Sequence, residues 1–269
     1  MVDRRRLVSP REMLAIDPGA VHRGADGFFW MMGPQTPPNA RHALYPDVAI
    51  VHVRGVLEHH ITEGADSYEG IVTKLAAAKG GTDSEEPKEP PAAVIACIDS
   101  RGGVVAGLFQ CVADIQRMFP RSGVPLVWYV NEMAASAGYA LCCSGHEIIG
   151  PASSVTGSIG TVSTIVSFVK QDEMTGVEVR LITSGARKAD GNPHAAITDE
   201  AEAAERDRVE DLAVLFITLA SKARAVPTKK IDAMQAGIFL GPKAKAAGLL
   251  DSVQSLDDVA RALSKQKTP

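Results

Sequence analysis

The sequence has no apolar run long enough to cross a membrane. The longest candidate, residues 212–220, is far shorter than the roughly 20 apolar residues that a membrane-spanning helix needs. Near the amino terminus, Arg4, Arg5 and Arg6 are not followed by an apolar segment, so no signal peptide is predicted. These absences predict a cytoplasmic protein without a membrane span.

The sequence also has little excess charge and few cysteines. With 28 Lys and Arg against 32 Asp and Glu, the formal net charge is -4, so no basic surface predicts a nucleic-acid partner. The four cysteines show no paired metal-binding spacing, and an adjacent pair is a poor disulfide framework. We predict that Cys97, Cys111, Cys142 and Cys143 are small buried apolar side chains. No metal or other cofactor is expected.

The order of the predicted elements indicates an α/β fold. Apolar runs rich in β-branched residues predict buried strands at 47–53, 92–98 and 124–130. Helical spacing of apolar residues follows two of these strands, at 68–78 and 108–119. This alternation is typical of a layered fold with a largely parallel sheet and flanking helices. Catalytic groups are then expected at the carboxyl ends of the strands.

The second half of the chain predicts shorter elements around one long helix. A short strand is predicted at 147–149, and further strand or strand-helix material at 162–169 and 177–182. Thr198 is the predicted cap of the long helix, with acidic residues in its first turn and one apolar stripe. Residues 227–263 predict short helices separated by glycines.

We interpret residues 45–263 as a single domain. Residues 1–44 contain several prolines and one apolar cluster between polar flanks, which indicates an extension rather than a domain. Residues 79–91 are rich in Gly, Glu and Pro and cannot bury apolar surface, so a mobile surface loop is predicted there. Residues 264–269 form a polar tail.

Ser136 is the candidate nucleophile, because it lies among small residues where a predicted strand meets a predicted helix. The strand at 124–130 precedes it, and residues 137–143 are small and apolar, as in a buried helix. A serine in the first turn of such a helix lies near the positive end of the helix dipole, and the next amide can donate to an oxyanion. Tight helix packing with an incidental hydroxyl explains the same stretch equally well.

Two glycines provide candidate oxyanion donors. Gly102 and Gly103 follow the strand at 92–98 and precede a helix, which leaves backbone amides accessible. An ordinary turn between a strand and a helix has the same pattern. A second loop, 153–160, is dense in hydroxyl groups and glycine and contains Ser158.

A serine nucleophile needs a base, and histidine is a poor candidate here. The Gly-x-Ser-x-Gly elbow is absent, and none of the seven histidines stands in a recognisable triad. A lysine can serve if desolvation keeps its amine neutral. Lys188 lies among small residues that would let its loop approach another site, although a solvated lysine beside Arg187 explains that loop as well. The Ser-x-x-Lys match at 264–267 lacks its partner motifs.

Four short motifs occur in a fixed order along the chain. They are Asp-Ser-Arg-Gly-Gly at 99–103, Ala-Ala-Ser-Ala-Gly-Tyr at 134–139, Thr-Gly-Ser-Ile-Gly at 156–160 and Ser-Gly-x-x-Lys at 184–188, with a further match at 241–251. Together they resemble the signal peptide peptidase A family of Ser/Lys peptidases, which has the ClpP/crotonase fold. The resemblance covers about residues 48–253.

The resemblance implies roles for six residues. Ser136 would be the nucleophile, Lys188 the general base, and Ser158 the residue that holds the lysine amine in line. The amides of Gly102, Gly103 and Ala137 would form the oxyanion hole. The implied reaction is hydrolysis of a polypeptide substrate through an acyl-enzyme. The resemblance also implies a homo-oligomeric ring, in which serine and lysine can come from neighbouring subunits.

Two departures refine the resemblance. Arg101 replaces a proline that is common in the family, so the oxyanion loop is expected to be less rigid or its arginine to contact substrate. The sequence Ala-Ser-Ala-Gly-Tyr at 135–139 resembles the phage capsid-assembly proteases of the family, which act on scaffold and portal proteins in the host cytoplasm or the prohead. The membrane anchor of other members is not expected here.

Three alternatives stay open at this point. One is a cytoplasmic protease that degrades peptides, as signal-peptide-clearing members do. Another is a peptidase-like assembly component without activity, which Arg101 keeps possible. The crotonase reaction of the same fold is a third, but it leaves Ser136, Ser158 and Lys188 without a joint role.

Overall fold

The computed structural model describes residues 44–60, 66–80 and 89–265, together with the backbone of four short strands before residue 42. The strands are β1 (Leu14–Ile16), β2 (His22–Arg23), β3 (Phe29–Trp30), β4 (Ala40–Arg41), β5 (Val48–Glu58), β6 (Asp66–Ser67), β7 (Ala93–Val104), β8 (Leu126–Ala135), β9 (Glu147–Gly150), β10 (Val155–Gly157), β11 (Ile238–Leu240) and β12 (Ser252–Val253). The helices are α1 (Tyr68–Lys79), α2 (Leu108–Met118), α3 (Ala137–Cys142), α4 (Val169–Thr175), α5 (Asp199–Arg224), α6 (Thr228–Asp232), α7 (Gly241–Ala247) and α8 (Leu256–Ser264).

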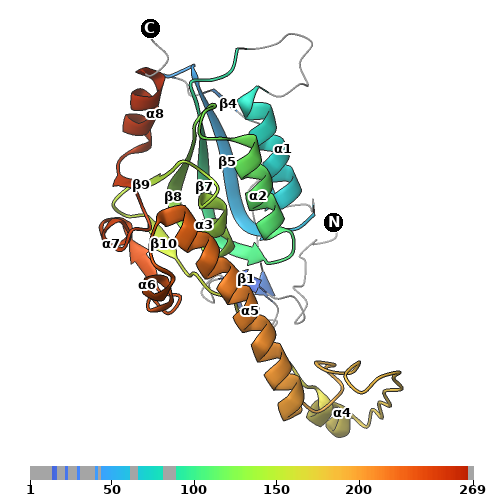
Figure 1. The fold of residues 1–269 in the computed structure, drawn as a ribbon. Helices are drawn as coiled ribbons and strands as arrows, with labels where there is room; N and C mark the ends of the chain where they lie inside the picture. The colour runs from blue at the N-terminus through green and yellow to red at the C-terminus, as the bar shows by residue number, and fades with distance from the viewer. Residues whose placement is uncertain are drawn as a thin grey trace.

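One sheet joins most of these strands in the order β11-β10-β8-β7-β5-β4, with β9 also paired to β8 (Figure 1). The pairs of β5 with β7, β7 with β8, and β8 with both β9 and β10 are all parallel. Antiparallel pairing is confined to short strands such as β1, β4 and β11. The predicted α/β architecture with a largely parallel sheet is therefore confirmed.

Helices cover both faces of this sheet, so successive strand residues are buried on opposite sides. Side chains such as Val94, Ala96 and Trp128 pack under α1, α2 and α3, together with Phe216 of α5. The alternate side chains, such as Ile95 and Val127, pack against α8. Burial on both faces explains why the predicted strands are continuous apolar runs rather than alternating ones.

The central strands are longer than predicted. β7 continues beyond the predicted end to Val104, so Gly102 and Gly103 lie within the strand rather than after it, and the prediction that they follow the strand is wrong. The two glycines pair with Val56 and Leu57 of β5 instead. A Cβ added at Gly103 would lie 1.9 Å from the Leu57 carbonyl oxygen, so only glycine permits this close approach.

The segment between β10 and α5 differs from the prediction. Residues 177–182 were expected to be strand material, but residues 177–183 form neither helix nor strand, and 162–169 contains only an isolated bridge and the first residue of α4. A strand needs a hydrogen-bonded neighbour, and no described strand of this chain lies beside 177–182. We refer to residues 161–198 as the arm. Figure 1 shows the arm at the far end of α5, away from the sheet.

The predicted long helix and its cap are confirmed. The side chain of Thr198 accepts a hydrogen bond from the Ala201 amide at 3.1 Å, and acidic residues occupy the first turn. The short helices predicted at the carboxyl end are α6, α7 and α8, but β11 and β12 were not foreseen. Of the described helices, none combines the length and the apolar character that a membrane span requires.

Several predictions fall wholly or partly outside the described residues. They concern most of the extension 1–44, positions 81–88 of the predicted loop 79–91, and positions 266–269 of the polar tail 264–269.

Candidate active site

Ser136 is the single residue between β8 and α3. Its backbone has φ 52° and ψ -124°, a combination that residues other than glycine rarely adopt. The residue is only 1% exposed, and its amide donates a hydrogen bond to the Gly157 carbonyl at 2.9 Å. Ser136 therefore lies directly before α3, and the packing around it maintains an unfavourable backbone geometry.

Ser158 directly follows the neighbouring strand β10, as Ser136 follows β8. The parallel register of β10 and β8 pairs Gly157 with Ala135, so the residue after each strand is a serine. Both serines have positive φ, 52° for Ser136 and 53° for Ser158, and Ser158 is anchored by a 3.0 Å hydrogen bond from its amide to the Gly237 carbonyl. The fold thus brings together two of the predicted residues that are 22 positions apart in the sequence.

The end of β7 brings the predicted oxyanion residues toward the same place. Ser100 pairs with Ala134, so Gly102 and Ser136 each follow this last pair by two residues. The Gly102 amide donates to Ser100 Oγ at 3.1 Å, and that hydroxyl donates to the Gly55 carbonyl at 2.7 Å. α3 approaches β7 closely at Gly138, where an added Cβ would lie 3.1 Å from the Ser100 carbonyl oxygen. Close packing of α3 on β7 therefore sets the position of Ala137.

Lys188 is not brought to this place within one chain. It is exposed in the arm, and its amide donates to the Gly185 carbonyl at 3.2 Å. Its side chain lines a hollow of about 650 Å³ between the arm and the start of α5, with Ser163, Arg187, Asp190, Glu205 and Arg208 among the other lining residues. Ser136 does not line this hollow, so the predicted serine-lysine pair is not assembled within the single chain.

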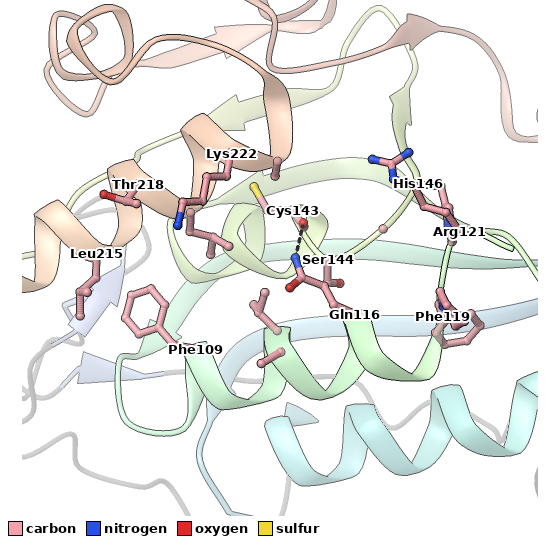
Figure 2. A pocket seen from close by; sticks show the side chains of 16 residues that line it. Phe109, Gln116, Phe119, Arg121, Cys143, Ser144, His146, Leu215, Thr218 and Lys222 are labelled. Atoms are coloured by element: carbon pink, nitrogen blue, oxygen red, sulfur yellow. Dashed lines mark hydrogen bonds between the residues drawn. The ribbon is translucent and has the colours of Figure 1, made fainter. Parts of the chain in front are cut away.

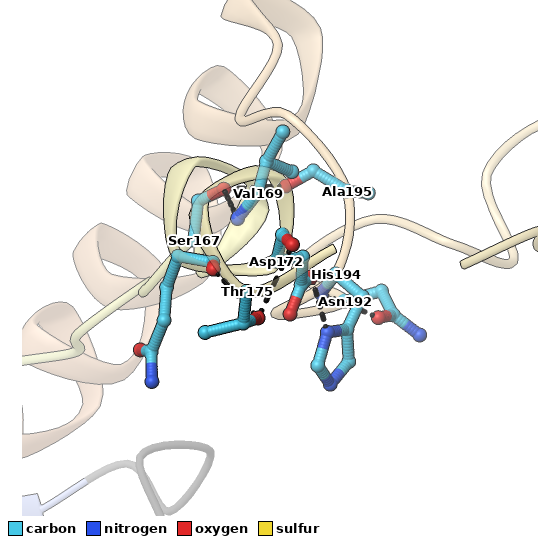
Figure 3. A network of polar contacts seen from close by, with 8 residues as sticks. Ser167, Val169, Asp172, Thr175, Asn192, His194 and Ala195 are labelled. Atoms are coloured by element: carbon cyan, nitrogen blue, oxygen red, sulfur yellow. Dashed lines mark hydrogen bonds and ion pairs between the residues drawn. The ribbon is translucent and has the colours of Figure 1, made fainter. Parts of the chain in front are cut away.

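The arm nevertheless has internal order of its own (Figure 3). His194 Nδ1 lies 2.7 Å from an Asp172 carboxylate oxygen, and Ser167 Oγ donates to the Ala195 carbonyl at 2.8 Å. The Phe168 amide donates to the Pro193 carbonyl at 2.6 Å. These contacts fasten α4 to the segment that leads into α5, so the loop carrying Lys188 is closed at its base.

A second hollow, of about 590 Å³, lies on the helical face between α2, the end of α3 and α5 (Figure 2). Phe109, Leu215 and Lys222 line it, and Gln116 spans one side by donating to the Cys143 carbonyl at 3.3 Å. None of the six predicted site residues contributes to it. This hollow is therefore separate from the candidate active site.

The cysteines are buried and do not form an alternative nucleophile. Cys97, Cys111, Cys142 and Cys143 are free and at most 4% exposed, as predicted. Burial raises the pKa of Cys97, Cys111 and Cys143 to about 12, so these thiols are neutral near pH 7. Among the described residues, no group of three His, Cys, Asp or Glu side chains is arranged to hold a metal.

Some residues that build the site were not predicted from the sequence. The buried Tyr139 hydroxyl donates to the Leu249 carbonyl at 3.0 Å, which ties α3 to the turn after α7. Arg224 binds that turn through the Gly248 carbonyl and through Asp251, whose carboxylate also accepts from the Ile148 amide at 2.7 Å. The carboxyl-terminal motif at 241–251 therefore supports the position of α3, a role that its residue types alone do not indicate.

Comparison with known proteins identifies the family. The family model described as Peptidase family S49 matches residues 118–268, which is more than half of the chain. The chain belongs to this family, and its sheet and helices agree with the ClpP/crotonase-like fold expected from the resemblance.

Similar individual proteins include two from phages and one from a bacterium. The chain is 27% identical over 216 residues to capsid assembly protease C of Escherichia phage lambda, which covers 78% of this chain and 47% of that protein. It is 28% identical over 216 residues to head-tail preconnector protein GP5 of Enterobacteria phage P21, covering 78% of this chain and 41% of that protein. Protease 4 of Salmonella typhi is 30% identical over 177 residues, 65% of this chain and 28% of that protein. The chain thus spans less than half of the length of each of these relatives.

Proposed function

We propose that the protein is a serine endopeptidase that uses Ser136 as nucleophile and Lys188 of a neighbouring subunit as general base. The observation that carries this proposal is the geometry at Ser136, a buried serine held at positive φ beside Ser158 at the end of a parallel sheet. Such strain persists only where the surrounding structure maintains it, and it is common at active sites. Membership of Peptidase family S49 supports the same chemistry.

In the proposed reaction, the neutral Lys188 amine accepts the Ser136 hydroxyl proton while Ser136 Oγ bonds to the substrate carbonyl carbon. The resulting oxyanion accepts hydrogen bonds from backbone amides of Gly102, Gly103 and Ala137, for which the Gly102 amide must leave Ser100 Oγ. Breakage of the C–N bond transfers the proton from Lys188 to the departing amine and leaves an acyl-enzyme. Water, deprotonated by Lys188, then releases the acyl group. Ser158 holds the lysine amine in line.

The arm supports a base supplied by a second copy of the chain. Eight of the thirteen large apolar side chains exposed in the described residues lie in the arm, and Ile182 is 97% exposed. Residues 177–181 alternate apolar and polar side chains, and Glu178 pairs with Arg180 on the polar side at 2.5 Å. This is the pattern of a half-buried strand that lacks a partner in its own chain. Pairing with a neighbouring subunit would bury the apolar side and exclude water from the loop that carries Lys188.

The test is complementation between two inactive variants. Ser136→Ala and Lys188→Ala chains are assembled together, and cleavage of an unstructured protein is measured beside native mass. In random 1:1 assembly, roughly a quarter of the sites of a ring would combine an intact serine with an intact lysine from the neighbour. We expect about that fraction of wild-type activity, whereas each variant alone is inactive.

The controls separate the remaining alternatives. Co-assembled variants that stay inactive, beside an active wild type, would show that the dyad is not shared between subunits. An assembled wild type that neither cleaves nor reacts with a fluorophosphonate probe would favour an assembly component without activity.

We further propose that the substrates are proteins of phage capsid assembly rather than peptides released from membranes. The similarity to proteins named capsid assembly protease and head-tail preconnector supports this choice. The Ser136→Ala chain serves as a trap for uncleaved substrate, and retained proteins are identified by mass spectrometry. Scaffold or portal proteins are expected, and their absence beside abundant short peptides would favour the peptide-degrading alternative.

A further inference from the structure

The short strand β1 pairs with the end of β7. It runs antiparallel, with Leu14 opposite Val104, Ala15 opposite Gly103 and Ile16 opposite Gly102. These partners include both glycines of the proposed oxyanion hole. A segment far from the site in the sequence therefore lies on the strand that contributes directly to it (Figure 1).

At Gly102 and Gly103, β1 pairs with the side of β7 to which no other described strand is paired. On one side of Gly102 and Gly103, β7 pairs with Val56 and Leu57 of β5. On the other side, β8 stays paired with β7 only as far as Ala134, opposite Ser100, and then turns through Ser136 into α3. β1 therefore continues the sheet in the place that β8 leaves, next to Ser136.

The direction of β1 is also informative. From Leu14 to Ile16 the chain runs from Val104 toward Gly102, and thus toward the level of Ser136. A polypeptide paired with β7 in the same direction would bring the carbonyl groups after this strand to the nucleophile. Addition of a strand to an open sheet edge uses main-chain hydrogen bonds, so it accepts many sequences.

We propose that residues 14–16 occupy the strand position of a polypeptide substrate and act as an intramolecular inhibitor. The position on β7 follows from the pairing alone, whereas the effect on rate rests on the proposed peptidase function. Because the segment belongs to the same chain, its effective concentration at the edge of β7 is high, and a substrate must displace it. If β1 is paired about nine-tenths of the time, its release would raise the rate about ten-fold.

The experiment uses the full chain with Ala15→Pro and Ile16→Pro together. Amides of successive strand residues point to opposite sides, so the two prolines remove one donor to β7 whichever residue provides it. Val2→Pro with Asp3→Pro is the matched control, outside β1 in the same amino-terminal region. Hydrogen exchange of the backbone at 102–104 and the initial rate of cleavage of an unstructured protein are measured on each chain.

We expect faster exchange at 102–104 and a rate increase of up to about ten-fold in the β1 variant, with the control like wild type. Unchanged exchange in the β1 variant would overturn the inference, whatever the activity. Faster exchange with an unchanged rate in an active enzyme would also overturn it, because the strand would then not compete with substrate. If exchange is faster in the β1 variant but neither wild type nor variant cleaves the protein, the proposed function is contradicted and the position of β1 on β7 stays supported.

Discussion

The end of the sheet around Ser136 and the arm that carries Lys188 are built in opposite ways. Ser136 is buried, and hydrogen bonds and close packing from β7, β10 and α3 determine its backbone. Lys188 is exposed on an arm that is ordered by its own contacts and presents apolar side chains outward. One chain therefore suffices to order the proposed nucleophile, whereas placement of the proposed base would need a further surface.

Replacement of Ser158 should have the largest effect, and it tests the buried site around Ser136. In Ser158→Ala we expect a loss of about 10²-fold in kcat, because the proposed mechanism assigns Ser158 to hold the lysine amine in line. The pH–rate profile should shift as well, since the base loses a hydrogen-bond partner, while native mass and unfolding stay like wild type. A purely structural role would instead lower stability and leave the pH profile unchanged.

A charge on the apolar side of residues 177–181 tests whether the arm that carries Lys188 packs against a second subunit. Val179→Asp introduces a carboxylate on the side that we expect to be buried by a second subunit, so both oligomer mass and activity should fall, by about ten-fold or more in activity. Glu178→Gln, on the opposite side of the same segment, is the matched control. A fully assembled and active Val179→Asp protein would contradict burial of this side.

The close pairing of β7 with β5 predicts a large effect on stability. In Gly103→Ala the added Cβ would lie 1.9 Å from the Leu57 carbonyl oxygen, so the strands must separate, at a cost of about 1–3 kcal/mol in the free energy of unfolding. At Gly123 the nearest atom to an added Cβ is 3.4 Å away, which makes Gly123→Ala the control, with an effect within about 0.5 kcal/mol. Denaturant unfolding measures both, and equal stabilities would refute the assigned contact.

The hydrogen bond from Tyr139 to Leu249 predicts a moderate effect. Tyr139→Phe removes the donor and leaves a buried carbonyl unpaired, which should lower the free energy of unfolding by about 1–2 kcal/mol. Activity should fall as well, because α3 loses its tie to the carboxyl-terminal turn. Phe109→Leu, which changes a side chain at the separate hollow on the helical face, serves as a comparison and should leave activity unchanged.

The smallest effect concerns the base of the arm and depends on pH. Glu205 accepts hydrogen bonds from Arg208 and Ser163, and these partners lower the pKa of the Glu205 carboxyl below its usual 4.5, with Arg208 the larger cause. The contribution to stability is therefore present above the usual pKa and is lost as pH falls through the lowered one. Hydrogen exchange at 161–166, corrected for intrinsic rates, should rise as the pH falls below 4.5 and through the lowered pKa.

Glu205→Gln should show the faster exchange already at pH 7 and lose the pH dependence. Glu202→Gln, which breaks only the exposed pair with Arg206, is the matched control and should behave like wild type. An equal response in both variants would mean that Glu205 does not hold the base of the arm.

The sequence alone determined the alternation of strands and helices, because burial on both faces of a parallel sheet requires continuous apolar runs such as 92–98 and 124–130. It also indicated Ser136 at a strand-helix junction and the capped helix α5, since small residues and cap residues act through local geometry. The motif order indicated the family.

Only the tertiary structure decided how far the strands continue and what lies beside Ser136. Gly102 and Gly103 belong to β7 because β5 lies alongside, and Ser158 lies next to Ser136 because β10 pairs with β8. The segment 177–182 has the pattern of a strand but forms none in this chain, because hydrogen bonding between strands depends on a partner that local sequence cannot supply. For the same reason, residues 14–16 could not be placed on β7 before the sheet was known.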